Sequence, residues 1–369
     1  MQSPLNKKVL LAVNTSKMVL SFRKDLIKKF QIEGFSVGVV ALDSVYEQQI
    51  RQLDVEFFCV NDDNRSLSPF KILSLKKKYC KIIEQFNPSI VMTFMLKPNV
   101  FCTRAAKKCG VERIFSMVEG AGQDFLHQKL KWKFIRQVLC SLYKKSFKHV
   151  NKVFFLNTDD RAEFIKRKLV KEDKVEIVRG IGVNLERFAF KPITNFKTFI
   201  MVARLTKEKG VFEYCETARA VKKKYPDAIF NYLGGEGAVK IADIKEYIDD
   251  KSINYLGETD NVIPYLEQST AFVLPSYREG LPMSVMEAQS IGRLVITSNC
   301  IGCRDTVVEG YNGFLVKTKD VNALAEKIIY IIENKEKAIQ LGENARAFAQ
   351  ENFDQNKINQ TLFDFAVKQ

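Results

Sequence analysis

Residues 275–292 read Pro275-Ser-Tyr-Arg-Glu-Gly-Leu-Pro-Met-Ser-Val-Met-Glu-Ala-Gln-Ser-Ile-Gly292 and directly follow the apolar run Phe272-Val-Leu274. The apolar run predicts the end of a buried strand, and Pro282 predicts the start of a helix because proline is favoured at the first helical position. A strand, a glycine-containing loop and a helix in this order point backbone N–H groups and a positive helix end at a ligand. The segment therefore predicts an α/β unit that binds a diphosphate. Glu287, about one turn into the helix, is placed to accept hydrogen bonds from ribose hydroxyls.

Short apolar runs alternate with helix-like segments along the rest of the chain. Strands are expected at residues 9–13, 36–41, 57–60, 90–94, 113–118, 153–156, 198–202 and 228–233, and helices at residues 22–31, 70–85, 100–109, 128–147 and 211–224. Such alternation implies mostly parallel sheets with helices on both faces. The pattern restarts after Lys191-Pro-Ile-Thr-Asn195, so we predict two doubly wound, Rossmann-like domains, residues 1–190 and 191–352, and a last helix over residues 353–369. Such domains bind ligands at the carboxyl ends of their strands, so a cleft between them is the expected site.

Composition excludes several classes of protein. The chain has 369 residues, of which 46% are apolar and 27% charged, as is typical of a globular protein and not of a disordered one. No apolar run approaches the roughly 18 residues of a membrane span and no signal peptide is recognised, so a soluble or peripheral protein is expected. The eight cysteines are then expected to be reduced. Cys300 and Cys303 have metal-ligand spacing, but a structural zinc site needs about four ligands, so ordinary buried or loop cysteines are favoured.

The net charge of +15 lies entirely in the first half of the chain. Residues 1–190 hold 35 Lys and Arg against 19 Asp and Glu, a balance of +16, and the remainder holds 23 against 24, a balance of −1. No acidic residue occurs between Asp124 and Asp159, where basic residues alternate with apolar ones. A basic amphipathic helix of this kind is typical of an anionic membrane surface, and a core-packed helix with a solvated basic face is the alternative. The residues expected to face the membrane are Lys131, Trp132, Lys133, Arg136, Lys144 and Lys145.

Two further loops of the second domain carry candidate binding residues. Arg204 and Lys209 lie in Met201-Val-Ala-Arg-Leu-Thr-Lys-Glu-Lys-Gly210, after the first expected strand of that domain. Two cations on one loop suit a diphosphate whose charge grows as a bond to it breaks, and a solvated basic loop is the alternative. Gly234 lies in a glycine cluster at the end of another strand, where it forms either a turn that faces the nucleotide or a tight connection.

The first domain offers three candidates, each with two interpretations. Glu119 ends a strand beside glycines, where it acts on an acceptor hydroxyl or caps the next segment. Lys97 precedes Pro98 and either contacts a phosphate or belongs to an N-terminal helix cap. Arg23 contacts a phosphate or is a surface arginine, and the surface position is favoured.

Specific strings resemble a known family. Residues 275–292 are similar to the donor-sugar motif of the family 4 retaining glycosyltransferases, and the resemblance covers nearly the whole chain. A closer likeness is to the bacterial α-1,3-N-acetylgalactosaminyltransferases that extend undecaprenyl-diphosphate-linked sugars in N-glycan and O-antigen pathways. It is carried by residues 118–122, 141–148, 274–280 and 300–303. The resemblance implies a GT-B fold, which has two doubly wound domains with a cleft between them and a C-terminal helix crossing back to the first.

The resemblance also implies a reaction. A hexose or N-acetylhexosamine, best matched by GalNAc from UDP-GalNAc in α-1,3 linkage, passes to a polyprenyl-diphosphate-linked saccharide. The implied catalytic residues are Glu279, Arg204 and Lys209, and Glu119 is added as a catalytic candidate because it lies near the position where many relatives carry a histidine. The implied donor-binding residues are Arg204, Lys209, Gly234, Glu258, Thr259, Glu279, Gly280, Leu281, Pro282 and Glu287. Arg23 and Lys97 are expected on the acceptor or phosphate side. No Asp-x-Asp occurs, so neither a metal nor another cofactor is expected. His127 and His149 do not match the family's histidine, so the departing phosphate is expected to take the proton.

The expected partners are a UDP-sugar, a polyprenyl-diphosphate-linked glycan and an anionic membrane surface, and no nucleic acid. The expected location is the cytoplasm, at the inner face of the cell membrane. Rival interpretations are another donor (UDP-Gal, UDP-GlcNAc or a GDP-sugar) in O-antigen or capsule synthesis, a nucleotide-sugar epimerase, a phosphorylase, and an inactive lipid-binding homologue. The intact set of two cations and two glutamates in the second domain favours an active transferase.

Overall fold

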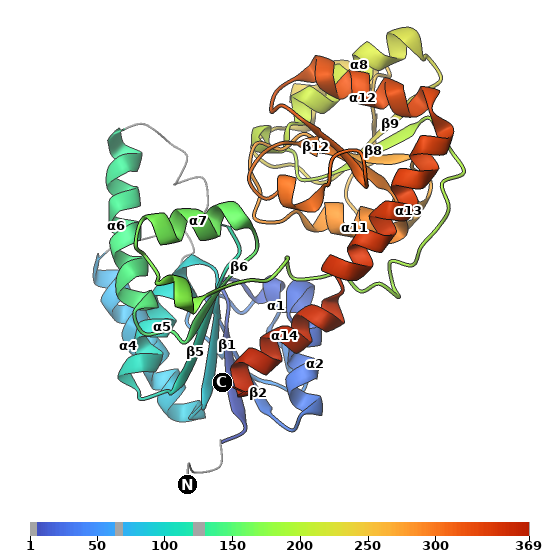
Figure 1. The fold of residues 1–369 in the computed structure, drawn as a ribbon. Helices are drawn as coiled ribbons and strands as arrows, with labels where there is room; N and C mark the ends of the chain where they lie inside the picture. The colour runs from blue at the N-terminus through green and yellow to red at the C-terminus, as the bar shows by residue number, and fades with distance from the viewer. Residues whose placement is uncertain (1–5, 63–68, 121–129, 369) are drawn as a thin grey trace. The chain divides into compact units, whose positions relative to one another are not determined.

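A computed structural model describes residues 6–62, 69–120 and 130–368, without the side chains of residues 69–73 and 130–132. The chain forms two compact units (Figure 1). The first unit holds Met1–Val178 together with Asn356–Gln369, and the second holds Arg179–Gln355.

The first unit is built on a seven-stranded sheet in the order β3-β2-β1-β4-β5-β6-β7. All its strand pairs are parallel. The chain leaves β1 in one direction to form β2 and β3 and later returns to its other side, so the order reverses between β1 and β4. The strands are β1 Lys8–Ala12, β2 Ser36–Ala41, β3 Glu56–Cys59, β4 Ile90–Phe94, β5 Arg113–Val118, β6 Lys152–Phe155 and β7 Val175–Ile177.

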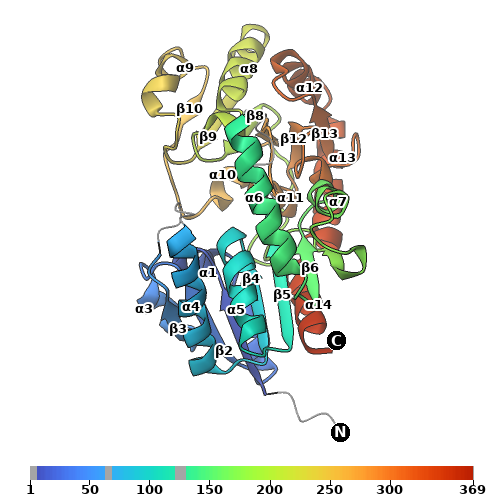
Figure 2. The ribbon, with the colours of Figure 1, turned by 90° about the vertical axis from the view of Figure 1, so that its left-hand side faces the viewer.

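Helices cover both faces of this sheet, as its apolar strands require. One face packs on α4, α5, α6 and α7, whose apolar side chains form a single core cluster with alternate strand residues. Figure 2 shows α4, α5 and α6 along this face. The helices of the unit are α1 Ser16–Phe22, α2 Lys24–Ile32, α3 Glu47–Arg51, α4 Pro69–Phe86, α5 Thr103–Lys108, α6 Leu130–Phe147 and α7 Thr158–Lys166, with a π-helix, η1, at Pro98–Cys102 and a 3-10 helix, η3, at Glu172–Lys174.

The last helix of the chain, α14 (Gln355–Lys368), packs on the first unit. The ring of Phe363 lies 5.2 Å from that of Phe30 on α2, and Phe365 lies 5.5 Å from Phe154 on β6. The guanidinium of Arg113 also donates a hydrogen bond of 3.1 Å to the backbone carbonyl of Ala366. These contacts confirm the C-terminal helix that returns to the first domain.

The second unit has a six-stranded parallel sheet in the order β10-β9-β8-β11-β12-β13. Its order reverses between β8 and β11, so the loops after these two strands lie at the switch point where such sheets bind ligands. The strands are β8 Thr198–Val202, β9 Ile229–Leu233, β10 Asn254–Tyr255, β11 Ala271–Leu274, β12 Leu294–Ser298 and β13 Gly313–Val316. The helices are α8 Val211–Lys224, α9 Lys245–Asp249, α10 Ile263–Glu267, α11 Met283–Ile291, α12 Val321–Glu333 and α13 Lys335–Asn352, with 3-10 helices η4 at Lys207–Lys209, η5 at Ile241–Ile244 and η6 at Arg304–Thr306.

The structure divides the chain after Val178, twelve residues before the predicted boundary at 190. The intervening segment belongs to the second unit because its backbone is bonded there. Val183 donates to the carbonyl of Phe353 at 2.8 Å, and Lys191 donates to that of Ile291 at 2.9 Å. Arg346 also donates to the carbonyl of Phe188 at 2.9 Å.

The predicted elements are recovered with small shifts, and two places differ more. The helix expected over residues 22–31 is interrupted at Arg23, whose φ of −125° separates α1 from α2. The helix expected over residues 100–109 is a π-helix followed by the short α5. β7 was not predicted because three residues are too few for a period-2 pattern to stand out.

Candidate active site

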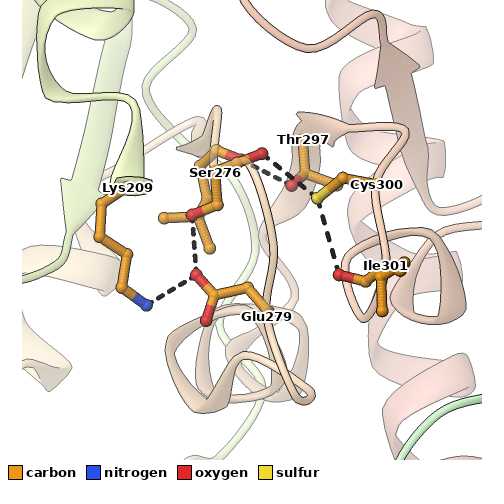
Figure 3. A network of polar contacts seen from close by, with 7 residues as sticks. Lys209, Ser276, Glu279, Thr297, Cys300 and Ile301 are labelled. Carbon is orange, nitrogen blue, oxygen red and sulfur yellow. Dashed lines mark hydrogen bonds and ion pairs between the residues drawn. The ribbon is translucent and has the colours of Figure 1, made fainter. Parts of the chain in front are cut away.

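The loop between β11 and α11 holds Glu279 in a defined position (Figure 3). Its Oε1 accepts hydrogen bonds from Lys209 Nζ at 2.6 Å and from Ser276 Oγ at 2.8 Å. The Glu279 side chain is 11% exposed and that of Lys209 is 31% exposed, so the ion pair is open to a ligand. A carboxylate that is oriented by two donors and still reaches solvent is suited to accept hydrogen bonds from sugar hydroxyls.

The backbone of Glu279 is held by the loop after β12. Its N–H donates to the carbonyl of Ile301 at 2.9 Å. Gly302 has a φ of +81°, and a Cβ there would lie 2.5 Å from the carbonyl oxygen of Glu279. Cys300 Sγ donates to the carbonyl of Ser276 at 3.2 Å (Figure 3). The string Cys300–Cys303 therefore supports the Glu279 loop.

No group of three or more His, Cys, Asp or Glu side chains in the described part of the chain is arranged to hold a metal ion. Cys300 and Cys303 are buried, in line with the favoured interpretation of ordinary cysteines. Metal-independent catalysis itself stays a prediction.

The loop that carries Lys209 is clamped to the Glu279 loop. Gly210 is the N-cap of α8 and has a φ of +77°, and a Cβ there would lie 2.2 Å from the carbonyl oxygen of Pro275. The N–H of Tyr277 donates to the carbonyl of Glu208 at 2.8 Å, and its hydroxyl donates to Glu213 Oε1 at 2.6 Å. Lys209 and Glu279, seventy positions apart in the sequence, thus form one rigid arrangement.

Arg204 follows β8 and therefore lies at the carboxyl end of the sheet, as the Glu279 loop after β11 does. Its side chain is exposed, and it forms no ion pair or hydrogen bond within the described residues. Gly237 packs beneath this loop, where a Cβ would lie 3.3 Å from Arg204 Cγ. The second cation of the predicted pair is therefore available to an anionic ligand.

Gly234 has a packing role. Its φ is +153°, and a Cβ there would lie 1.9 Å from the carbonyl oxygen of Ala203. Its N–H donates to the carbonyl of Gly257 at 2.7 Å. These contacts agree with the tight connection, one of the two interpretations of the glycine cluster, and a contact with a nucleotide stays a prediction.

The predicted base-binding residues, Glu258 and Thr259, lie on the loop after β10. Glu258 is exposed, and a Cβ on Gly235 would lie 2.5 Å from its Oε2. The hydroxyl of Thr259 accepts from the N–H of Asn261 at 3.1 Å. In the sheet order, two strands, β9 and β8, lie between β10 and β11.

Helix α11 begins one residue later than predicted. Pro282 is its N-cap, with an extended φ and ψ of −72° and 115°, and no side chain caps its N–H groups in the described structure. Leu281 is buried, and a Cβ on Gly180 would lie 3.0 Å from its Cδ2. Gly280, which precedes Leu281 and Pro282, is partly buried. Residues 280–282 thus connect the Glu279 loop to the N-terminus of α11, which has no side-chain cap in the described structure.

Glu287 lies in the second turn of α11 and is partly buried. Burial raises the pKa of its carboxyl to about 7, and the nearby Arg187 opposes this shift. Neither Arg187 nor Ser276 was predicted as a site residue. Ser276 lies within the segment 275–292, but a serine three residues before a glutamate has no distinctive spacing, and neither has an isolated arginine.

The structure corrects the interpretation of Arg23. Its side chain is 1% exposed, so it is not a surface arginine. It forms an ion pair with Glu119 and lies 4.0 Å from the ring centre of Phe94. Burial lowers the pKa of Arg23 to about 9. Arg23 and Glu119, 8% exposed, thus neutralise each other inside the first unit. The action of Glu119 on an acceptor hydroxyl stays a prediction, and the segment that it would cap lies outside the described residues.

Lys97 is also buried, with 3% of its surface exposed. Its Nζ lies 2.6 Å from Asp62 Oδ2, in an ion pair that joins the ends of β3 and β4. The sequence did not predict Asp62 as the partner of Lys97, because the two residues lie thirty-five positions apart in the chain. Lys97 is also the N-cap residue of η1, in line with the interpretation as part of a helix cap, and its contact with a phosphate stays a prediction.

Helix α6 shows features of both predicted interpretations. Leu139, Tyr143 and Phe147 pack into the core cluster or are buried beside it. Phe134 and Val138, one turn apart, are 70% and 42% exposed. Lys133, Lys144 and Lys145 are exposed and Arg136 is partly buried, whereas the side chains of Lys131 and Trp132 lie outside the described residues. Within the described chain, no helix has the length and apolarity to span a bilayer.

Comparison with known proteins shows the family to which this chain is similar. Residues 183–348 match the family "Glycosyl transferases group 1", and residues 8–157 match "Glycosyl transferase 4-like". The N,N'-diacetylbacillosaminyl-diphospho-undecaprenol alpha-1,3-N-acetylgalactosaminyltransferase of Campylobacter jejuni is 30% identical over 95% of this chain and 96% of its own. The UDP-Gal:alpha-D-GlcNAc-diphosphoundecaprenol alpha-1,3-galactosyltransferase of Escherichia coli is 25% identical over 91% of this chain and 90% of its own.

The fold is shared with solved glycosyltransferase structures. The crystal structure of Anabaena HepE in complex with UDP aligns with a TM-score of 0.81 at 16% identity, covering 98% of this chain and 100% of that one. A glycosyltransferase from Rickettsia africae aligns with a TM-score of 0.78 at 20% identity, covering 98% of both chains. The chain is therefore a glycosyltransferase of GT-B fold and belongs to the family 4-like glycosyltransferases.

Proposed function

We propose that this enzyme transfers an N-acetylhexosamine or hexose from a UDP-sugar, with retention, to a saccharide on polyprenyl diphosphate. One observation carries the proposal: the Glu279 carboxylate is held by Lys209 and Ser276 beside the uncapped N-terminus of α11. That arrangement offers a cation and free N–H groups to a diphosphate and an acceptor atom to a sugar. The names of the Campylobacter and E. coli relatives support an undecaprenyl-diphosphate-linked acceptor.

Each residue has a role in the proposed reaction. Arg204 and Lys209 stabilise the charge that develops on UDP as the bond between the anomeric carbon and the phosphate oxygen breaks. Glu279 holds donor-sugar hydroxyls, and Glu287 holds the ribose. The acceptor hydroxyl attacks from the face that UDP leaves, its oxygen forms the new glycosidic bond, and its proton passes to the departing phosphate oxygen. This scheme needs neither a strong side-chain base nor a metal ion.

The donor we favour is UDP-GalNAc, forming an α-1,3 linkage. The Campylobacter relative, whose name contains alpha-1,3-N-acetylgalactosaminyltransferase, is similar to this chain over nearly its full length. UDP-galactose is the alternative, since the E. coli relative is named for that donor at a lower identity of 25%.

We further propose that the enzyme works at the cytoplasmic face of the membrane through α6. The exposed Phe134 and Val138 would enter the interface, and Lys133, Lys144 and Lys145 would meet anionic headgroups. Each such lysine contributes about 1 kcal/mol near an anionic surface.

The test is a panel of UDP- and GDP-sugars, incubated in EDTA with and without a polyprenyl-diphosphate-linked saccharide. UDP release from one donor, raised by the acceptor, with an α-linked product by NMR, is the expected result. A β-linked product would overturn retention, and loss of activity restored by Mg²⁺ would overturn the metal-independent scheme. No turnover of any UDP-sugar would overturn the proposed donor class.

A further inference from the structure

A pocket with a basic rim lies in the first unit, and none of its lining residues is among those proposed for sugar transfer. It has a volume of about 600 Å³ and is lined by the last turn of α6, the C-terminal part of α7 and the segment that leads through η3. The lining residues are Lys144, Phe147, Lys148, Ile165, Lys168, Leu169, Val170, Lys171 and Lys174. This size lies within the range of ligand pockets, and five of its nine lining residues are lysines.

The lysines and the apolar residues occupy different parts of the pocket. Lys144, Lys148, Lys168 and Lys171 are exposed, and none of them forms an ion pair within the described chain. The apolar side chains are buried or partly buried and form the floor: Phe147, Ile165, Leu169 and Val170. None of the described residues that line the pocket is acidic. The pocket is therefore complementary to a molecule with an anionic head and a hydrocarbon part.

Lys174 has a different role from the other lysines. Its Nζ donates to the carbonyls of Val150 at 2.6 Å and Lys148 at 3.2 Å, which ties η3 to the end of α6. Of the neighbouring acids, Glu172 pairs with Arg161 at 3.1 Å and Glu163 with Arg167, whereas the exposed Asp173 interacts electrostatically with Lys174. Among the residues that the structure describes, the four exposed lysines thus form no ion pair with a carboxylate.

We propose that this pocket binds one anionic phospholipid, with its phosphate among the lysines and the start of an acyl chain over the apolar floor. A soluble anion would leave that floor without a partner, and the base of a nucleotide would need side-chain hydrogen-bond acceptors, whereas the polar side chains of the described lining are lysines, which only donate. The pocket lies on α6, whose other exposed residues include Phe134 and Val138, so a membrane lipid is its accessible ligand. The proposal concerns lipid binding alone and does not require that the proposed sugar transfer is correct.

The experiment titrates the full chain with dihexanoyl phosphatidylglycerol, below its micelle concentration, by isothermal titration calorimetry. Dihexanoyl phosphatidylcholine and glycerol 3-phosphate are the controls for charge and for hydrocarbon. We expect saturable binding of the anionic lipid and at least tenfold weaker binding of both controls. Equal binding of glycerol 3-phosphate would overturn the proposal in favour of a simple anion site. Equal binding of phosphatidylcholine would overturn it too, because the lysines would then not select an anionic headgroup.

Two matched variants locate the site. Lys148→Gln/Lys171→Gln removes two rim charges, and Lys77→Gln/Lys81→Gln removes two exposed charges from α4. The first pair of substitutions should weaken lipid binding about tenfold or more, because each lysine near an anionic headgroup contributes about 1 kcal/mol to binding. The second pair should change the affinity less than twofold. Equal effects of the two variants on affinity would overturn the assignment of the lipid to this pocket.

A third variant, Ile165→Gln, tests the floor and should weaken binding of the lipid without creating affinity for glycerol 3-phosphate. Thermal melts of all variants establish that they are folded. Tighter binding of farnesyl diphosphate than of phosphatidylglycerol, by tenfold or more, would overturn the assignment in favour of a polyprenyl diphosphate. Donor hydrolysis by the same preparations separates failure of this proposal from failure of the proposed enzyme activity.

Discussion

The two units each contain an ion pair between residues that the sequence analysis selected, and the pairs differ in exposure. Lys209 and Glu279 in the second unit are 31% and 11% exposed. Arg23 and Glu119 in the first unit are 1% and 8% exposed. A pair that reaches solvent can exchange its partner for a ligand, whereas a buried pair that loses its partner leaves an uncompensated charge. We therefore expect the more exposed pair to contact a ligand and the buried pair to stabilise the fold.

The largest expected effect is on the buried pair. Glu119→Gln leaves the Arg23 guanidinium without its carboxylate and should lower the free energy of unfolding by about 3–5 kcal/mol. Chemical denaturation measures the change. The control is Glu333→Gln, which breaks an exposed pair with Lys224 and should shift the transition little. A stable Glu119→Gln variant with reduced activity would instead make Glu119 a residue of the reaction.

The open pair should show the reverse pattern. Glu279→Gln should lower kcat by about 100- to 1,000-fold while the melting temperature changes little, because a preorganised polar contact to the reacting sugar is lost. Initial rates with the preferred UDP-sugar measure the effect. The exposed Glu326→Gln removes the same charge from α12 and should keep full activity. Wild-type turnover in Glu279→Gln would contradict the assignment of the active site.

The support beneath Glu279 can be tested with two glycines that share a left-handed backbone. Gly302→Ala places a Cβ 2.5 Å from the carbonyl oxygen of Glu279, whereas Gly310→Ala, at a φ of +72°, has nothing within 4 Å. Both variants should lower the free energy of unfolding by about 1–2 kcal/mol, because alanine is disfavoured in a left-handed backbone conformation. Only Gly302→Ala should also lose activity, by about tenfold or more, because Glu279 must move. Equal activities would show that the loop after β12 does not position Glu279.

The smallest effect concerns Glu287, whose burial raises its pKa to about 7. The folded state then binds a proton more tightly than the unfolded state, so the carboxyl lowers stability as the pH rises from about 4 to above 7. Glu287→Gln should therefore increase the free energy of unfolding by about 1 kcal/mol at pH 8, and by little at pH 5.

UDP binding gives the second readout of Glu287. Wild-type affinity should fall as the pH falls through about 7, because the protonated carboxyl is a weaker acceptor, and Glu287→Gln should remove this dependence. Glu216→Gln, at an exposed position of α8, is the matched control and should leave both measurements unchanged. A pH-independent stability difference would contradict the buried-charge explanation.

The sequence by itself determined the family, the alternating parallel architecture and the segment that carries Glu279. These features depend on local patterns: apolar runs of strand length, helix periodicity, and glycines and prolines at fixed offsets within residues 275–292. The comparisons confirm the family, the fold class and the enzyme class. The individual roles of the site residues stay predictions.

Only the tertiary structure decided which charged residues are buried and which partner each one has. Arg23 meets Glu119, and Lys97 meets Asp62, across ninety-six and thirty-five positions of the chain. The segment after Val178 joined the second unit through backbone bonds to Phe353 and Ile291. Local sequence patterns set secondary structure, but contacts between distant segments set burial and pairing. Burial and pairing therefore appear only when the sheets bring those segments together.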